Sequence, residues 1–266
     1  MTTPHGTSTN GSGVRLYAVT WDDGSILHLP SVTSIVGVCG EKGGLVSWAA
    51  KQVAEAAVSE EEWRSLDEDA AIKYLSQAHQ RSSQGAARIG DEVHAAIEAD
   101  VRGRPRPEVS RSAAGCLRSW DQFLDEHTPD LVATEVRVVN RSVGYAGSLD
   151  VLMVVDLRDG EGRRPVVADV KTGKRLYAAS LGLQLAAYAN AERTLFGDEL
   201  RPMLSVSTDK ALALHLRPRS WNAVPVDISE AWTSFRHLVQ VAAWQWVKSE
   251  RALLPSLSWP DRTVPS

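Results

Sequence analysis

The chain has 266 residues, of which 43% are hydrophobic and 23% are charged, and its formal net charge is −4. This composition is that of an ordinary globular protein, which excludes disordered, fibrous and membrane-embedded classes. No apolar run reaches the roughly 18 residues of a membrane span, and the N-terminus does not resemble a signal peptide, so we expect a cytoplasmic protein. The mild acidity argues against coating nucleic acid by bulk charge, although it leaves room for a local basic groove.

Residues 1–13 are polar and rich in turn-forming residues, so we expect a disordered arm there. Segments 15–21 and 26–29 are rich in strand-forming residues and flank an Asp-Gly pair, which predicts a β-hairpin. We expect this hairpin to open an N-terminal hairpin and helical region, residues 14–83, that packs on the core.

Three helices are predicted next. The Ala-rich segment 43–83 has helical spacing, and Ser59 with Glu62 forms a capping box that predicts the start of a second helix. A third helix is expected over 83–101, with an apolar stripe at every fourth residue, and a fourth over 113–126.

The middle of the chain changes to β-structure, which indicates a mixed α/β (α+β) protein. Segments rich in β-branched residues predict strands, and apolar helical spacing returns after them. The expected elements are strands 131–140, 146–156 and 165–171, a helix 178–196, strands 203–208 and 211–217, and a helix 228–250. We therefore expect a core over 84–250 and a tail over 251–266. The sequence contains no phosphate-binding or dinucleotide-binding glycine motif.

Charged residues lie inside strands that otherwise look buried. The turns between the strands set the register: Glu135 is expected to face Asp150, and Asp150 to face Asp169 or Val170. The two-residue period of a strand then puts Lys171 beside Asp169. The alternative is a surface ladder of salt bridges on a half-exposed sheet.

Carboxylates this close to one another require a cation, and hard oxygen ligands suit Mg²⁺ or Mn²⁺. A neighbouring lysine can orient an attacking water, and metal ions can stabilise the leaving oxygen of a phosphodiester. This set of groups is therefore suited to phosphodiester hydrolysis.

Two further pieces lie on predicted helices. His94 is one residue from the apolar stripe of its helix and is a competent metal ligand, although a lone helical histidine is more often a core or boundary residue. Gln184 and Tyr188 are four residues apart and share one helix face, which in isolation marks only polar helix positions.

Together these pieces resemble the RecB-like branch of the PD-(D/E)xK nuclease superfamily, in particular CRISPR-associated exonucleases and phage-encoded relatives. The resemblance covers residues 90–188, and in chain order it rests on Gly90–His94, Glu135, Gly147–Asp150, Asp169–Lys171 and Gln184 with Tyr188. It implies a restriction-endonuclease-like core of the order α-β-β-β-α-β with an N-terminal helical extension. It also implies a metal-dependent DNA nuclease.

The resemblance implies a role for each motif position. Asp150 and Asp169 would ligate Mg²⁺ or Mn²⁺ together with the carbonyl group of Val170, and His94 would complete the metal site. Lys171 would position the attacking water. These residues form the expected catalytic and metal-binding set.

The remaining positions are less central, and the sequence departs from the family pattern in places. Glu135 would be a further ligand or a supporting group, and Gln184 with Tyr188 would support the site or contact DNA. Asp91 replaces a threonine that is common in the family, and Asp169 replaces the more usual glutamate. The four cysteines that hold an iron–sulfur cluster in many relatives are absent, because the chain has only two, so we expect no cluster.

Basic residues near these elements could contact DNA phosphates, although an ordinary solvated surface is the alternative. They are Arg81, Arg88, Arg137, Arg141, Arg163, Arg164, Lys174 and Arg175. We favour the pairs Arg163–Arg164 and Lys174–Arg175.

We expect an exonuclease that acts on single- or double-stranded DNA ends in recombination, end processing or phage DNA metabolism, in a bacterial or phage-infected cytoplasm. A recombination or annealing protein would be a natural partner. A structure-specific endonuclease with the same site, or a nuclease-fold module that binds without cutting, remain alternatives.

Overall fold

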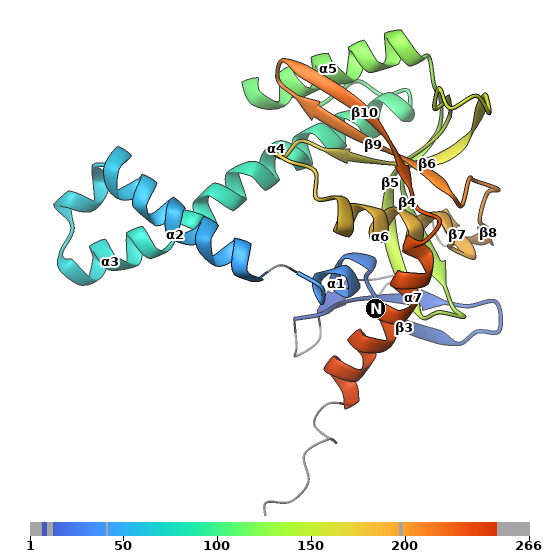
Figure 1. The fold of residues 1–266 in the computed structure, drawn as a ribbon, viewed down its shortest axis with the longest axis horizontal. Coiled ribbons are helices and arrows are strands. Elements are labelled where there is room, and N and C mark those ends of the chain that lie inside the picture. Colours follow the sequence, from blue (N-terminus) through green and yellow to red (C-terminus); the bar gives the residue numbers. More distant parts are fainter. Residues whose placement is uncertain (1–6, 10–12, 41, 197–198, 249–266) are drawn as a thin grey trace, which may run out of the picture.

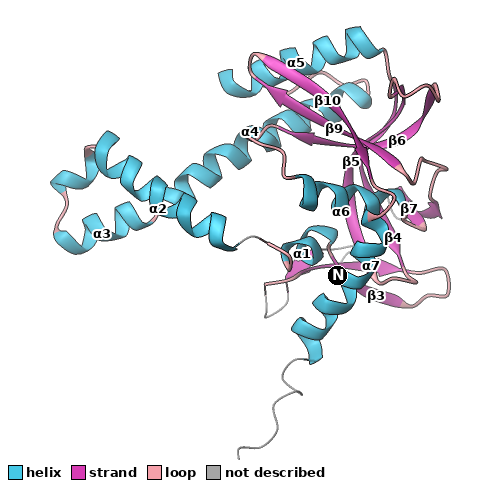
Figure 2. Ribbon diagram, in the orientation of Figure 1, coloured by secondary structure: helices cyan, strands magenta, loops and turns pink. Residues whose placement is uncertain are grey.

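The computed structural model describes residues 7–9, 13–40, 42–196 and 199–248. Helices and strands form a mixed α/β body, from which a helical extension projects to one side (Figures 1 and 2). Among the described residues, no helix is long and apolar enough to cross a membrane.

A small antiparallel sheet begins the chain. It consists of β1 (Thr7–Thr9), β2 (Arg15–Thr20) and β3 (Ile26–Pro30), in that spatial order. The predicted hairpin is confirmed. Part of the expected disordered arm is instead strand β1, because it pairs with β2; the rest, residues 1–6 and 10–12, lies outside the described residues.

A short helix, α1 (Val32–Gly37), connects this sheet to the helical extension. The hydroxyl of Ser31 caps it by accepting the backbone N–H of Ser34 at 3.0 Å. Val32 and Ile35 are fully buried against the main body. This helix therefore fastens the N-terminal hairpin to the core.

The extension comprises α2 (Lys42–Ser59), a 3₁₀ turn (Glu62–Ser65), α3 (Glu68–Ser76) and the first half of α4 (Ala78–Val101). We call residues 42–88 the helical arm; it stands away from the sheet (Figure 1).

The capping box predicted in the arm is wrong. The Ser59 hydroxyl donates back to the carbonyl of Glu55 at 2.8 Å, so Ser59 ends a helix instead of starting one. Asp67 caps the following helix by accepting the N–H of Ala70. The predicted third helix also begins earlier than expected, at Ala78.

The main sheet has seven strands in the order β10-β9-β6-β5-β4-β7-β8. Neighbouring strands pair antiparallel except β6 and β9, which are parallel. Its strands are β4 (Asp130–Asn140), β5 (Tyr145–Asp156), β6 (Arg163–Lys171), β7 (Arg193–Phe196), β8 (Glu199–Pro202), β9 (Lys210–Arg217) and β10 (Ser220–Asp227). The three predicted central strands are confirmed to within two residues.

Helices cover both faces of this sheet. Against one face, the second half of α4 and α5 (Arg111–His127) bury Val93, Trp120 and Phe123. Against the other, α1, α6 (Ala178–Ala189) and α7 (Ala231–Ala243) bury a second apolar cluster. The molecule is thus a helix–sheet–helix sandwich, which agrees with the predicted mixed α/β class.

The expectations after β6 are confirmed only in part. The predicted helix 178–196 ends at Ala189, since the segment beyond it forms β7 and pairs with β4. Residues 203–208 are not a strand, and β10 was not expected. The final predicted helix begins at Ala231 and continues as a π-helical turn over Trp244–Lys248. Its last residues and the expected tail 251–266 lie outside the described residues.

Candidate metal centre

The candidate site lies where β4, β5 and β6 carry their carboxylates. Thr134 pairs with Val151 and Val136 with Leu149, so Glu135 faces Asp150 as predicted. The pairing of β5 with β6 ends at Val151 and Ala168, one residue before Asp150 and Asp169. The acidic residues therefore sit where the β5–β6 ladder stops.

The Asp150 carboxylate accepts a hydrogen bond from a backbone N–H group at this point. Its Oδ2 accepts the N–H of Val170 at 2.8 Å, a group that the β5–β6 ladder no longer uses. The hydroxyl of Thr134 donates to the Asp150 carbonyl at 2.8 Å and fixes the backbone from the other side. Burial, with the nearby charge of Asp169, raises the pKa of Asp150 to about 6.

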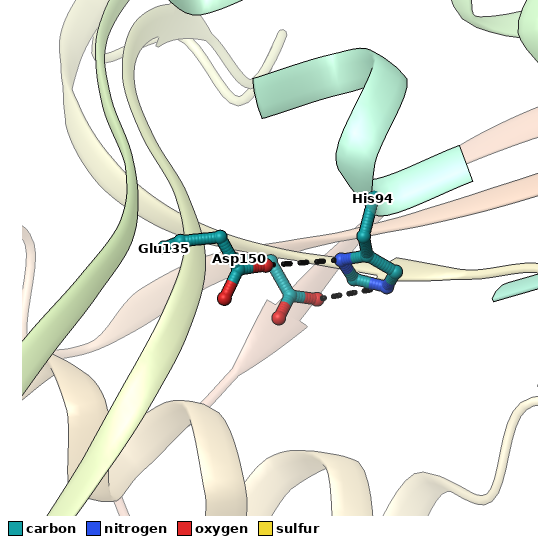
Figure 3. A group of neighbouring side chains, drawn as sticks. All are labelled: His94, Glu135 and Asp150. Carbon is teal, nitrogen blue, oxygen red and sulfur yellow. Dashed lines mark ion pairs between the residues drawn. The ribbon is translucent and has the colours of Figure 1, made fainter. Parts of the chain in front are cut away.

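His94 reaches this site from α4, as Figure 3 shows. Its Nδ1 lies 3.4 Å from Oε1 of Glu135, and its Nε2 lies 3.9 Å from Oδ2 of Asp150. Burial alone would lower the pKa of His94, but the hydrogen bond with Glu135 and the charge of Asp150 outweigh it and raise that pKa. The imidazole thus bridges two carboxylates.

These three residues form a potential cation site. One ligand atom from each of His94, Glu135 and Asp150 lies within 4.8 Å of the others. An imidazole nitrogen with two carboxylate oxygens is a donor set that divalent cations bind. These three residues could therefore hold a metal ion.

Asp169 is close to Asp150 but is not one of these three clustered residues. It is only 1% exposed, and its Oδ1 accepts hydrogen bonds from Lys171 Nζ at 2.7 Å and from Gln184 Nε2 at 3.1 Å. Burial raises the pKa of Asp169, while the Lys171 charge partly opposes that shift. The predicted neighbour relation of Asp169 and Lys171 is confirmed, and Gln184 joins them from α6.

Tyr188 lies on α6, four residues after Gln184, and contacts it. Its hydroxyl accepts a hydrogen bond from Gln184 Nε2 at 3.3 Å. Its ring lies against Gly147 so closely that a Cβ on this glycine would be 2.7 Å from the ring carbon Cε1, and 3.1 Å from Val32. Gly147 therefore allows α6 and α1 to approach β5 directly below the site.

Glu135 has a backbone conformation that is unusual for a side chain of its size. Its φ is 49°, in the left-handed region, within strand β4. Such a conformation costs about 1–3 kcal/mol and persists only where the surroundings fix it. Here the Glu135 carboxylate receives the Ser148 hydroxyl at 3.1 Å in addition to His94.

Sequence reasoning missed several groups around the site. Thr134 carried no signal beyond ordinary strand polarity, and Tyr17 comes from the distant N-terminal hairpin. Ser148 was part of the motif Gly147–Asp150, but its hydrogen bond to Glu135 was not predicted. A cavity of about 440 Å³ opens beside His94 and Glu135. Its other lining residues are Tyr17, Asp91, Ala95, Glu98, Arg137 and Ser148.

The predicted DNA-contacting cations lie in different parts of the structure. Arg88 lies on α4 and pairs with Glu92 at 3.7 Å, whereas Lys174 and Arg175 are exposed in the loop after β6. Arg163 and Arg164 begin β6, at the opposite end from Lys171, and pair with acidic residues there. Of the two pairs favoured from the sequence, the structure brings only Lys174–Arg175 next to the site.

No family model matches this sequence, and no curated protein matches it. Among solved structures, the crystal structure of SSO0001 is similar to the chain, at 15% sequence identity and a TM-score of 0.31. The match covers 78% of this chain and 89% of that chain. A likeness of this size carries no argument about fold or function.

Proposed function

We propose that the protein is a metal-dependent DNA nuclease with a RecB-like PD-(D/E)xK core, which hydrolyses phosphodiester bonds at DNA ends. One observation carries the proposal: residues far apart in the chain, singled out from the sequence, meet at the end of the β5–β6 ladder. They are His94, Glu135, Asp150, Asp169, Lys171 and Gln184. The element order supports the same proposal, because α5, β4, β5, β6 and α6 are followed, after the inserted β7–β8 hairpin, by β9, which pairs parallel with β6.

Each group has a task in this proposal. His94, Glu135 and Asp150 would hold Mg²⁺ or Mn²⁺, with Asp169 as the adjacent carboxylate. A metal held by these residues would supply charge that stabilises the oxygens of the phosphodiester. Lys171 is 39% exposed at its side chain and keeps its Nζ at the buried Asp169, so it can orient a water molecule for attack.

A buried cluster of carboxylates lowers the free energy of unfolding unless it is fully paired, so a cluster of this kind suggests a chemical role. Asp169 is almost fully buried, and an isolated carboxylate in such surroundings costs several kcal/mol. In the described part of the chain, Oδ1 of Asp169 accepts hydrogen bonds from Lys171 and Gln184, whereas its buried Oδ2 has the Lys171 ion pair and no hydrogen-bond partner. Such arrangements are concentrated at functional sites.

The test compares cleavage of end-labelled linear DNA and of closed circular DNA with Mg²⁺, with Mn²⁺ and with EDTA. Wild-type protein should degrade the linear DNA from its ends only with a metal. Asp150→Asn and Asp169→Asn should abolish cleavage while melting like the wild type or higher, since each removes a buried charge.

Two outcomes would overturn the proposal. One is a wild type that is inert on every DNA and with every metal, which would favour a binding module. The other is equal cleavage by the variants. Cleavage of circular DNA would retain the site chemistry and replace the exonuclease by an endonuclease.

A further inference from the structure

The loop 172–177 joins β6 to α6, and both of its ends lead into the candidate metal centre. Lys171 is the last residue of β6, and Gln184 follows on α6, where it contacts Asp169. A chain of six residues spans at most about 20 Å, so Tyr177 at the end of the loop lies within a few nucleotides' length of Lys171. Whatever this loop binds would thus be close to the reacting phosphodiester.

Two side chains from β9 fix the backbone of this loop. Arg217 Nη1 donates to the carbonyls of Thr172 at 3.0 Å and Gly173 at 2.6 Å, and His215 Nε2 lies 2.7 Å from the same Gly173 carbonyl. Gly90 of α4 lies next to the start of the loop, since a Cβ there would be 3.7 Å from the Thr172 hydroxyl oxygen, an ordinary contact. The first two residues of the loop are therefore held in place by contacts within the protein.

The fixed loop presents three side chains to solvent. Lys174 and Arg175 are exposed, and Tyr177 is 71% exposed. Within the described part of the chain, the two cations have no ion-pair partner, and the Tyr177 ring has no aromatic or cation contact. Two unpaired cations and an exposed aromatic ring on one short loop form the combination by which proteins bind single-stranded nucleic acid.

We propose that this loop holds a single-stranded DNA end, with Tyr177 stacked on one base and with Lys174 and Arg175 on the adjacent phosphates. The proposal rests on the proposed function and deepens it by naming the substrate class. An unpaired strand is required because the bases of a duplex are already stacked on one another, whereas the face of an unpaired base is open to the Tyr177 ring. Arg217 and His215 act as positioning residues for the loop.

The stacking is tested by binding in EDTA, where no cleavage occurs, using fluorescence anisotropy with a labelled single-stranded oligonucleotide. In a series of oligonucleotides, each base near the end is replaced in turn by an abasic residue. For the wild type, one replacement should weaken binding roughly 5- to 150-fold, the range of base–aromatic stacking. Tyr177→Ala should bind the intact strand more weakly by a similar factor and respond to no abasic position.

If the Tyr177 ring had only a structural role, its removal would weaken binding whether or not a given base is present. Loss of the abasic effect in Tyr177→Ala therefore separates base stacking from a structural role. Tyr177→Trp should restore both the affinity and the abasic effect. If the wild type binds every abasic oligonucleotide as well as the intact one, or if Tyr177→Ala keeps the abasic effect, the stacking proposal is overturned.

The cations are tested by salt dependence. Lys174→Ala and Arg175→Ala should each reduce the slope of log affinity against log salt by about 0.7, the value per phosphate contact on a single strand. Arg163→Ala is the matched control: it removes the same charge at the far end of β6, where Arg163 pairs with Asp130 at 2.9 Å. An unchanged slope in both loop variants, or an equal change in the control, would overturn the phosphate contacts.

The outcomes also separate this inference from the proposed function. A wild type that cuts DNA but shows no Tyr177-dependent stacking retains the nuclease and overturns the loop's role. A wild type that binds single strands through Tyr177 but never cuts supports the loop's role and overturns the nuclease. A wild type that neither binds nor cuts overturns both.

Discussion

The helical arm and the sheet core differ in what they bury, although α4 runs through both. Among the arm residues whose side chains the structure describes, the buried apolar ones are Ala56 and Ala78, whereas Val58 is 83% exposed. In the second half of α4, Val93 and Ile97 are almost fully buried against the sheet. One continuous helix therefore has two different environments.

Polar and aromatic contacts hold the arm together instead. Arg81 reaches Glu60 at 2.8 Å, donates to the Tyr74 carbonyl at 2.7 Å, and lies over the Tyr74 ring at 4.0 Å. Half-exposed ion pairs of this kind contribute little to stability. The fold and the candidate chemistry therefore depend on the sheet core, and the helical arm is a weakly packed extension of it.

The largest contrast is expected between two lysines. Lys171→Ala should lower DNA cleavage by about 10²–10⁴-fold, because it removes the group that would position the attacking water. Lys73→Ala, an exposed position on α3, should leave cleavage unchanged. Initial rates of cleavage of end-labelled DNA measure the effect of each substitution. Similar losses in the two variants would mean that the helical arm takes part in catalysis, which would contradict the division between arm and core.

A second pair compares the same truncation in the two regions. Ile97→Ala creates a cavity at a position that is 1% exposed and should reduce the free energy of unfolding by about 2–5 kcal/mol. Ile72→Ala, at 60% exposure on α3, should change it by no more than about 0.5 kcal/mol. Urea denaturation followed by circular dichroism gives both values; a large loss at Ile72 would show that the arm is covered in solution.

A third pair uses two glycines and should give effects of opposite sign. Gly147→Ala drives a methyl group into the Tyr188 ring and should destabilise the protein by about 1–3 kcal/mol. Gly85→Ala lies in an exposed turn of α4 with nothing within 4 Å, and should stabilise it by about 0.4–1 kcal/mol. Thermal melting of both variants is sufficient, and shifts of the same sign would contradict the packing described for the two regions.

The register of the central strands could be predicted because local chemistry fixes it. The turn between β4 and β5 is short and ends at Gly144, whose φ is 90°, so it sets which residues face each other. The alternation of charged and apolar residues then assigned the faces correctly. The pairing of Glu135 with Asp150 follows from these two facts, and the turn between β5 and β6 adds Asp169 to them in the same way.

The errors arose where tertiary contacts outweigh local preference. Residues after Ala189 look helical, but Asn140 donates to the carbonyl of Asn190 at 2.9 Å, and the following segment pairs with β4. Strand β10 contains Pro225, which argues against a strand except at the edge of a sheet, where β10 lies. Neither the partner strand nor the edge position can be read from the segment itself.

Parts of the candidate site were beyond sequence reasoning for the same reason. The left-handed φ of Glu135 depends on the contacts of its carboxylate with His94 and Ser148, which no local pattern encodes. The contribution of Tyr17 to the adjoining cavity depends on how the N-terminal hairpin docks.

The contact between Gly147 and Tyr188 has a consequence for how this sequence can diverge. A side chain at position 147 would collide with the ring, so the two positions are not free to vary independently. In descendants of this chain, a larger residue at 147 should appear only together with a smaller one at 188, and the hydroxyl that Gln184 contacts would then be lost. Gly147 and Tyr188 look like separate motif positions, but substitutions at the two are expected to occur together.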